Sequence, residues 1–408
     1  MSPSLKTFSS LKYPSYRFYL GMYLSQTVTG DMRTIAQYLL IYRLTDSVAI
    51  LGVMALVSAL PGILMPLVGG VIADRLPKKY IIVLGQASAM IPSLLVAVSL
   101  TTGFLSAEHA GSWWIIIVAS FLNYVVFGLS MPSRQAVVAD LVGADHIMNA
   151  ISLRSMGYNI LHMGVPAIAG VLIDVVGFEV VYYIMGGFSF IGFVLALFLP
   201  ISGTLEVRSG NVLSQLKDGF KYIRGEFNLL FILGLSMMAS LLATPYIRLM
   251  PVFVDDILKV GASGMGILLS ASAVGSLASS IIMASLPNKR RGAMLLAATS
   301  ILGIALTFFA LSRNWYLSLA FIVIVGLTQP ARATLTNTLL QSFTAPNYRG
   351  RVLSLYAMQD GITSLGAFVA AMVAEVVGVP FTVGGFALTI VLLSVLAMIF
   401  IPRIRKLE

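Results

Sequence analysis

The sequence has no cysteine, only three histidines and few charged residues, which make up 10% of its 408 positions. Without cysteine the chain can form no disulfide and offers neither a thiol nucleophile nor thiolate metal ligands. The remaining residues show no metal-ligand spacing, phosphate-binding loop or nucleophile–base pair. We therefore expect that the protein binds no metal or cofactor and is not an enzyme. Soluble globular proteins carry about 25% charged residues, and this chain therefore falls outside that class.

The sequence is instead rich in apolar residues, which account for 58% of the chain and give a mean hydropathy of +0.94. Apolar runs of about 20 residues, the length at which a helix crosses a bilayer, recur along the whole chain. A backbone in hydrocarbon must satisfy its own hydrogen bonds, and these runs are too long for barrel strands. We therefore expect an all-α membrane protein with twelve transmembrane helices, at 16–43, 49–73, 80–102, 113–141, 148–173, 180–202, 227–254, 263–286, 293–312, 315–342, 351–376 and 381–402.

The net charge of +10 does not indicate a nucleic-acid partner, because the basic residues follow the pattern of membrane loops. With a cytoplasmic N-terminus, most of the 26 lysines and arginines fall in inward-facing segments, and the outward loops hold Arg43, Lys259 and Arg313. The positive-inside rule then predicts a multi-pass protein of the inner membrane with both termini in the cytoplasm. We expect no cleavable signal peptide, since the first apolar span is long and lacks a small-residue cleavage site.

The two halves of the chain repeat one pattern. GLSMPSR at 128–134 matches GLTQPAR at 326–332, and DVVG at 174–177 matches EVVG at 375–378. Six helices used twice in the same orientation predict two six-helix bundles, related by a pseudo-twofold axis along the membrane normal.

We expect the two bundles to cover residues 1–202 and 227–408, joined by the polar segment 203–226. This linker is predicted to contain an amphipathic helix on the inner membrane surface. Its apolar stripe consists of Leu213, Leu216, Phe220 and Ile223.

The loop after the second span, GGVIADRLPKKY, resembles a known signature, Gly-x-x-x-Asp-Arg-x-Gly-Arg-Arg, of the major facilitator superfamily. The residues that match it are Gly70, Asp74, Arg75, Lys78 and Lys79. Pro77 stands where the signature has its second glycine. The resemblance covers essentially the whole chain and implies the major facilitator fold.

Two further stretches, PVFVDDIL at 251–258 and APNYRGRVLSLY at 345–356, resemble one branch of this superfamily more closely. That branch contains enterobactin-type siderophore exporters and macrolide-efflux proteins and, more distantly, a lysophospholipid transporter. MGVPAIAG at 163–170 resembles the glycine-proline element of drug:proton antiporters, although an ordinary packing patch around a proline kink is the alternative.

The superfamily resemblance also implies a conformational latch at the cytoplasmic side. Asp74 would face the start of the eleventh helix near Arg349 and Arg351, where the helix dipole favours a carboxylate. Arg75 or Lys78 would reach Asp140 at the inner end of the fourth helix. The alternative is that these charges serve only to orient the loop during insertion.

Four arginines lie within the predicted spans, namely Arg33, Arg134, Arg248 and Arg332. The resemblance implies that their helices line a central cavity, and an unpaired arginine facing lipid costs at least about 2.5–3.5 kcal/mol. We expect them to bind substrate, together with Tyr38, Tyr158, Asn159, Tyr356 and Gln359. The four arginines outnumber the two intramembrane acids, Asp31 and Asp360, and this excess of positive charge favours an anionic or amphiphilic substrate.

Asp31, Asp360 and His162 are the predicted proton-coupling residues. Asp31 lies near the middle of the first span on a polar face with Thr27 and Thr34. Alternating hydration of such a carboxylate between two open states would couple protons to substrate. The alternatives are a static ion pair with Arg33 or Arg134 for Asp31, a structural hydrogen bond for Asp360 and simple packing for His162.

The sequence therefore predicts a monomeric, proton-coupled antiporter that expels an amphipathic organic compound, such as a drug or a siderophore-like molecule, by alternating access. Its partners would be the small-molecule substrate, protons and the lipid bilayer. Two alternatives remain: a transporter of lipids, lysolipids or anionic metabolites, with or without proton coupling, and a non-transporting sensor built on a transporter fold.

Overall fold

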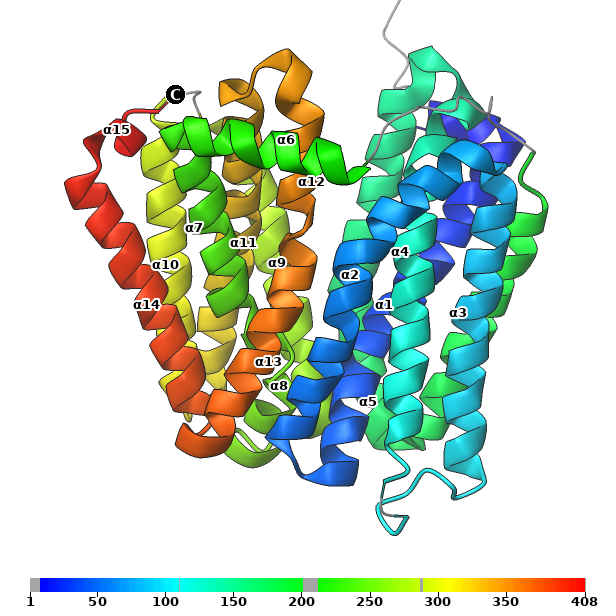
Figure 1. Cartoon of the computed structure of the whole chain (residues 1–408). Helices are drawn as coiled ribbons and strands as arrows, with labels where there is room; N and C mark the ends of the chain where they lie inside the picture. Colours follow the sequence, from blue (N-terminus) through cyan, green and yellow to red (C-terminus); the bar gives the residue numbers. More distant parts are fainter. Residues whose placement is uncertain (1–7, 110, 201–211, 287–288, 408) are drawn as a thin grey trace, which may run out of the picture. The chain divides into compact units, whose positions relative to one another are not determined.

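The computed structural model describes residues 8–109, 111–200, 212–286 and 289–407. The side chains at 66–67, 70–71, 73–75, 144 and 212–217 also lie outside the description. All regular elements in the described residues are helices (Figure 1). The chain divides into two compact units, and the division passes through the second helix.

The first unit contains the residues up to Asp46 and those from Leu60 to the end of the fifth long helix. Its helices are α1 (Pro14–Thr45), the later part of α2 (Val48–Arg75), α3 (Lys78–Thr101), α4 (Trp114–Val142) and α5 (Ile147–Leu197), with the 3₁₀ turns η1 (Ser9–Lys12) and η2 (Ala144–His146). Helix α5 packs on α1 and on α3, and α3 packs on α4.

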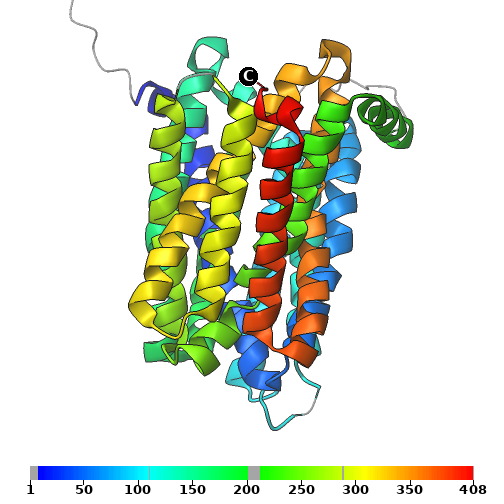
Figure 2. The same ribbon diagram turned by 90° about the vertical axis from the view of Figure 1, so that its left-hand side faces the viewer.

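The second unit contains Ser47–Ala59, which is the start of α2, and the chain from α6 onward. Its helices are α6 (Val212–Gly225), α7 (Phe227–Ala243), η3 (Thr244–Ile247), α8 (Met250–Val252), the π-helix η4 (Phe253–Ile257), α9 (Gly261–Ser285), α10 (Arg291–Leu311), α11 (Trp315–Phe343), η5 (Pro346–Tyr348), α12 (Arg349–Ala357), α13 (Gln359–Val377), α14 (Val379–Phe400) and α15 (Pro402–Arg405). Helix α13 packs on α7, α14 on α10, and α10 on α11, which repeats the pairing of the first unit (Figures 1 and 2).

The described residues contain ten helices that are long and apolar enough to cross a membrane. One of them, α5, is 51 residues long and is interrupted at Gly177, so it accounts for two of the expected spans. Helix α1, whose apolar run is broken by Asp31 and Arg33, accounts for the first. The all-α membrane fold of two helix bundles is confirmed.

Glycine marks the same turn in both halves. Gly177 has φ 84° and ψ 169°, and Gly378, between α13 and α14, has φ 87° and ψ 151°. Only glycine adopts this backbone region readily, because a side chain would collide with the neighbouring peptide groups. The repeated DVVG and EVVG sequences therefore form the same backbone turn in both halves.

Two expected helices are interrupted in the second unit. The span expected at 227–254 ends as an α-helix at Ala243 and continues as short 3₁₀, α and π segments. Pro245 and Pro251 lie in this stretch, and proline removes a backbone donor and crowds the preceding turn. The helix expected at 351–376 is divided at Met358 into α12 and α13.

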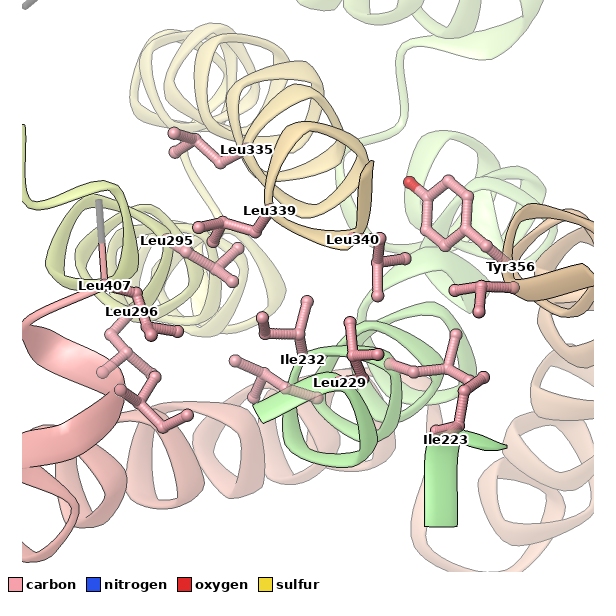
Figure 3. Close-up of a cluster of buried hydrophobic side chains, with 14 of the residues drawn as sticks. Ile223, Leu229, Ile232, Leu295, Leu296, Leu335, Leu339, Leu340, Tyr356 and Leu407 are labelled. Atoms are coloured by element: carbon pink, nitrogen blue, oxygen red, sulfur yellow. The ribbon is translucent and has the colours of Figure 1, made fainter. Parts of the chain in front are cut away.

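Helix α6 is anchored by a cluster of buried apolar side chains in the second unit. Figure 3 shows Ile223 of α6 beside Leu229 and Ile232 of α7, with Leu339 and Leu340 of α11 opposite. Helix α6 lies crosswise to the long helices of this unit (Figures 1 and 2). Phe220 is exposed, as an interfacial helix requires, and the side chains of Leu213 and Leu216 lie outside the description.

Candidate functional site

The first unit contains a pocket of ≈ 260 Å³ between α1, α4 and α5. Its wall combines aromatic rings with charged groups of both signs. The lining includes Tyr19, Tyr23, Asp31, Phe127, Arg134, Arg154 and Tyr158. Pockets that bind organic ligands have this character, a mostly apolar wall with a few polar groups that fix orientation.

Asp31 on α1 pairs with His162 on α5. The distance from Asp31 Oδ1 to His162 Nδ1 is 2.9 Å, and the side chains are 13% and 40% exposed. Tyr158, one turn before His162, stacks on its ring at 5.2 Å. The second carboxylate oxygen of Asp31 is buried without a hydrogen-bond partner among the described residues. Asp31 lines the pocket and His162 does not, so the pair reaches the pocket through the carboxylate.

Two arginines present positive charge to the same pocket. Arg134 donates from Nη2 to the Phe127 carbonyl at 3.0 Å, and its guanidinium lies 4.6 Å from the centre of the Phe127 ring. Arg154 donates to the Tyr19 hydroxyl at 3.2 Å and lies over the ring of Tyr23 at 5.2 Å. Neither forms a salt bridge within the described part of the chain, so both charges can serve a ligand.

The other predicted residues of the first unit lie elsewhere. Arg33 does not line this pocket and instead borders two smaller pockets inside the helix bundle. Tyr38 is buried, with 3% of its surface exposed. Asn159 is half-buried beside Tyr158 and is not part of the pocket wall.

In the second unit, Arg332 occupies the repeat position of Arg134 and, like it, is buried; it lies between α11 and α7. It is 4% exposed and donates from Nη1 to Ser236 at 3.1 Å. Tyr356 is also buried, with its hydroxyl donating to the Ala333 carbonyl at 3.4 Å. Gln359 accepts a hydrogen bond from Ser240 at 3.4 Å. These three hydrogen bonds join helices within the second unit: α11 to α7, α12 to α11 and α7 to α13.

Arg248 and Asp360 lie close together along the second unit. Arg248 donates to Ser58 at 3.1 Å and to Ser364 at 2.8 Å, and Ser364 donates in turn to the Asp360 carbonyl at 3.2 Å. The Asp360 side chain is exposed and lies in the first turn of α13, where the helix dipole favours a carboxylate. The division of the eleventh span at Met358 creates this helix N-terminus.

The start of α2 packs against α13. The Ala49 amide donates to Glu375 Oε2 at 3.1 Å, and Gly52 allows close approach because a Cβ there would meet Ala371. This contact explains why residues Ser47–Ala59 belong to the second unit.

Among the predicted latch residues, Lys78 donates to Asp140 at 2.7 Å. Arg351 lies 3.6 Å from Asp218 on α6, and Arg349 donates to the Thr344 carbonyl at 3.3 Å. Lys79 is half-buried. The side chains of Asp74 and Arg75 and the surroundings of Gly70 lie outside the description.

Sequence reasoning missed six residues of the pocket wall, namely Tyr19, Tyr23, Phe127, Met131, Gln135 and Arg154. Tyr19 and Tyr23 precede Thr27 and Asp31 at intervals of four, which places them on one face of α1. Arg154 is likewise four residues before Tyr158 and eight before His162. The signal was present, but tyrosine is common at membrane interfaces and Arg154 fitted the inner-loop charge.

Comparison with known proteins gives one family. Residues 6–408 match the model of a family described as transmembrane secretion effectors. The staphyloferrin A transporter of Staphylococcus aureus is 25% identical over 88% of this chain and 89% of its own length. The Escherichia coli enterobactin exporter EntS is 25% identical over 83% and 81%.

Solved structures share the fold at lower identity. The nucleoside transporter NupG superposes with a TM-score of 0.75 at 14% identity, over 95% of this chain and 98% of that one. A POT family transporter in complex with 5-aminolevulinic acid gives 0.77 at 11% identity, over 96% and 97%. These structures support the fold alone.

Proposed function

Because the chain belongs to the transmembrane secretion effectors of the major facilitator superfamily, we propose that it exports an anionic, amphipathic organic compound in exchange for protons. Membership of this family makes it a multi-pass membrane transporter of small molecules and not an enzyme. We further propose that transport is coupled to protons and directed outward. The protein would act as a monomer in the cytoplasmic membrane, with both termini in the cytoplasm.

One observation carries the proposal: Asp31, which is paired with His162, lines the same pocket as Arg134 and Arg154. An anionic substrate binds to the two guanidinium groups, and a hydroxyl group of the same compound donates to the second oxygen of the ionised Asp31 carboxylate, which has no partner among the described residues. A proton on this carboxylate weakens that hydrogen bond, because the acceptor loses its charge. Proton and substrate therefore oppose each other's binding, as exchange requires.

The aromatic wall and the two arginines support a siderophore-like substrate. Arginine binds carboxylate and phenolate oxygens through its fork of N–H donors, and tyrosine rings pack on flat organic groups. Two relatives at 25% identity are named for staphyloferrin A and enterobactin. At that identity the relatives support the class of compound and leave the individual substrate open.

Inside-out membrane vesicles test the proposal directly. Vesicles acidified in the lumen are expected to accumulate an anionic iron-chelating compound, and an ionophore that collapses the pH gradient should abolish the accumulation. Uptake that is indifferent to the gradient would contradict proton coupling. Uptake of a lysophospholipid without any uptake of the chelator would instead favour the lipid-transporter alternative.

A further inference from the structure

Arg33 is a cation inside the first helix bundle. It borders a pocket of ≈ 60 Å³ enclosed by α1, α3, α4 and α5, and it also borders a second pocket of ≈ 10 Å³. Its Nε is inaccessible and has no hydrogen-bond partner among the described residues. No salt bridge joins Arg33 to a carboxylate in the described chain.

The larger pocket contains further unused hydrogen-bonding capacity. Gln86 on α3 is 2% exposed, and its Nε2 is buried without a partner among the described residues. Tyr182, on the side of the smaller pocket, is 3% exposed and its hydroxyl is likewise unpartnered. Buried donors are normally satisfied, and each unmade bond costs about 1–3 kcal/mol. Two such groups near a cation whose own Nε is unpartnered in the described chain indicate a site that a ligand completes.

Charge decides what that ligand is. The described residues that line the ≈ 60 Å³ pocket are neutral apart from Arg33, and they include no carboxylate. An isolated buried cation is far more costly than an unmade neutral hydrogen bond. We infer that this pocket binds a small inorganic anion of chloride size, held between the Arg33 guanidinium and the Gln86 side-chain amide.

The size of the pocket agrees with this ligand. A water needs about 10–15 Å³ of such volume, so the pocket has room for one small anion with one or two waters, and the ≈ 10 Å³ pocket has room for a single water at most. Gly30 keeps the space open, because a Cβ at this position would meet no atom within 4 Å. An organic substrate is too large to enter.

The site is distinct from the substrate pocket, although Gln26, Gly30 and Phe127 border both. An anion bound here would neutralise Arg33 in place of Asp31, and it would join α1 to α3 through two side chains. The inference does not depend on proton coupling or on the identity of the exported compound.

Thermal unfolding of the purified full-length protein tests the site. Chloride is titrated against gluconate at constant sodium, and the wild type should show a saturable rise in Tm of about 3 °C. In Gln86→Glu a built-in carboxylate replaces the anion, so Tm in gluconate should already be high and chloride should add nothing. Arg33→Met should also lose the chloride response. Gln341→Glu, an exposed change of the same chemistry in the second unit, should keep it.

Bromide provides the direct measurement. Crystals grown in sodium bromide should show an anomalous peak between Arg33 and Gln86 in the wild type and none in Gln86→Glu. A wild-type Tm independent of chloride, or an equal rise in Arg33→Met, would overturn the inference. Absence of the bromide peak from the wild type would mean that the pocket holds water alone, and this too would overturn it.

Discussion

Replacement of Asp31 by asparagine is expected to uncouple transport from protons while preserving the pocket. Asparagine has nearly the volume of aspartate, and its Oδ1 can still accept the hydrogen bond that His162 Nδ1 makes at 2.9 Å. What the variant loses is the ability to bind and release a proton. The change therefore separates the chemistry of the carboxylate from its role in packing α1 against α5.

The expected magnitude follows from the number of carboxylates that carry protons. A difference of one pH unit is worth about 1.4 kcal/mol per proton, which sustains a tenfold concentration gradient of substrate. If Asp31 alone carries a proton, the wild type should accumulate substrate about tenfold, and Asp31→Asn should not accumulate substrate above the outside concentration. If Asp360 carries a second proton, the wild type should reach about a hundredfold, and each asparagine variant should lose a factor of about ten.

The assay is the steady-state accumulation ratio in proteoliposomes with an imposed difference of one pH unit. Exchange of labelled for unlabelled substrate without a gradient should persist in Asp31→Asn, which shows that the protein is folded and still binds. Asp145→Asn, an exposed change in η2, is the matched control and should behave as wild type. A wild-type accumulation ratio in Asp31→Asn would refute the assignment.

Three further outcomes are expected. Arg134→Gln and Arg154→Gln should each raise the KM for an anionic substrate about tenfold or more, since hydrogen bonds to a charged group contribute about 1.5–3 kcal/mol. The KM for a neutral analogue should stay unchanged. Equal effects on both substrates would contradict this expectation. Gly378→Ala should lower the free energy of unfolding by about 1–3 kcal/mol because of its φ of 87°, whereas Gly385→Ala, with free space around it, should not. Lys78→Glu should slow transport, because it places a negative charge beside Asp140. The double variant with Asp140→Lys should restore the transport rate. A double variant as slow as the single one would show that the Lys78–Asp140 ion pair plays no part in transport.

Much of the fold could be predicted because the bilayer leaves few choices. Long apolar runs must be helices, and the matched EVVG and DVVG stretches predict matched turns, which Gly177 and Gly378 form with nearly the same dihedral angles. The family resemblance, read from the loop after the second span, is confirmed by the match over residues 6–408. Both conclusions depend on local sequence alone.

The interruptions of the helices could not be read from hydropathy. The apolar span expected from hydropathy runs to residue 254 although the α-helix ends at Ala243, because hydropathy averages over proline. The division at Met358 carries no proline, and nothing in the surrounding sequence explains it. Yet it creates the N-terminus on which Asp360 lies.

The site could be predicted by residue type but not by partner. Asp31, His162 and Arg134 are conspicuous in a membrane sequence because ionisable groups there are rare. That Asp31 contacts His162 depends on how α1 packs against α5, which no spacing within one helix reveals. Arg332 and its repeat partner Arg134 are both buried, at 4% and 7% exposure, but Arg332 donates to Ser236 whereas Arg134 donates to the Phe127 carbonyl, so the repeat does not predict the partner.

The different surroundings of Asp31 and Arg33 follow from helix geometry. Residues two apart on an α-helix point about 200° away from each other around its axis, because each residue turns it by about 100°. Asp31 therefore lines the pocket with Arg134 while Arg33 lies within the bundle, and the two do not form an ion pair. Paired with Arg33, the carboxylate would have a partner that never loses its proton. Its observed partner is His162, and an imidazole, unlike a guanidinium, can release its proton, which is the property that a proton-coupled site needs.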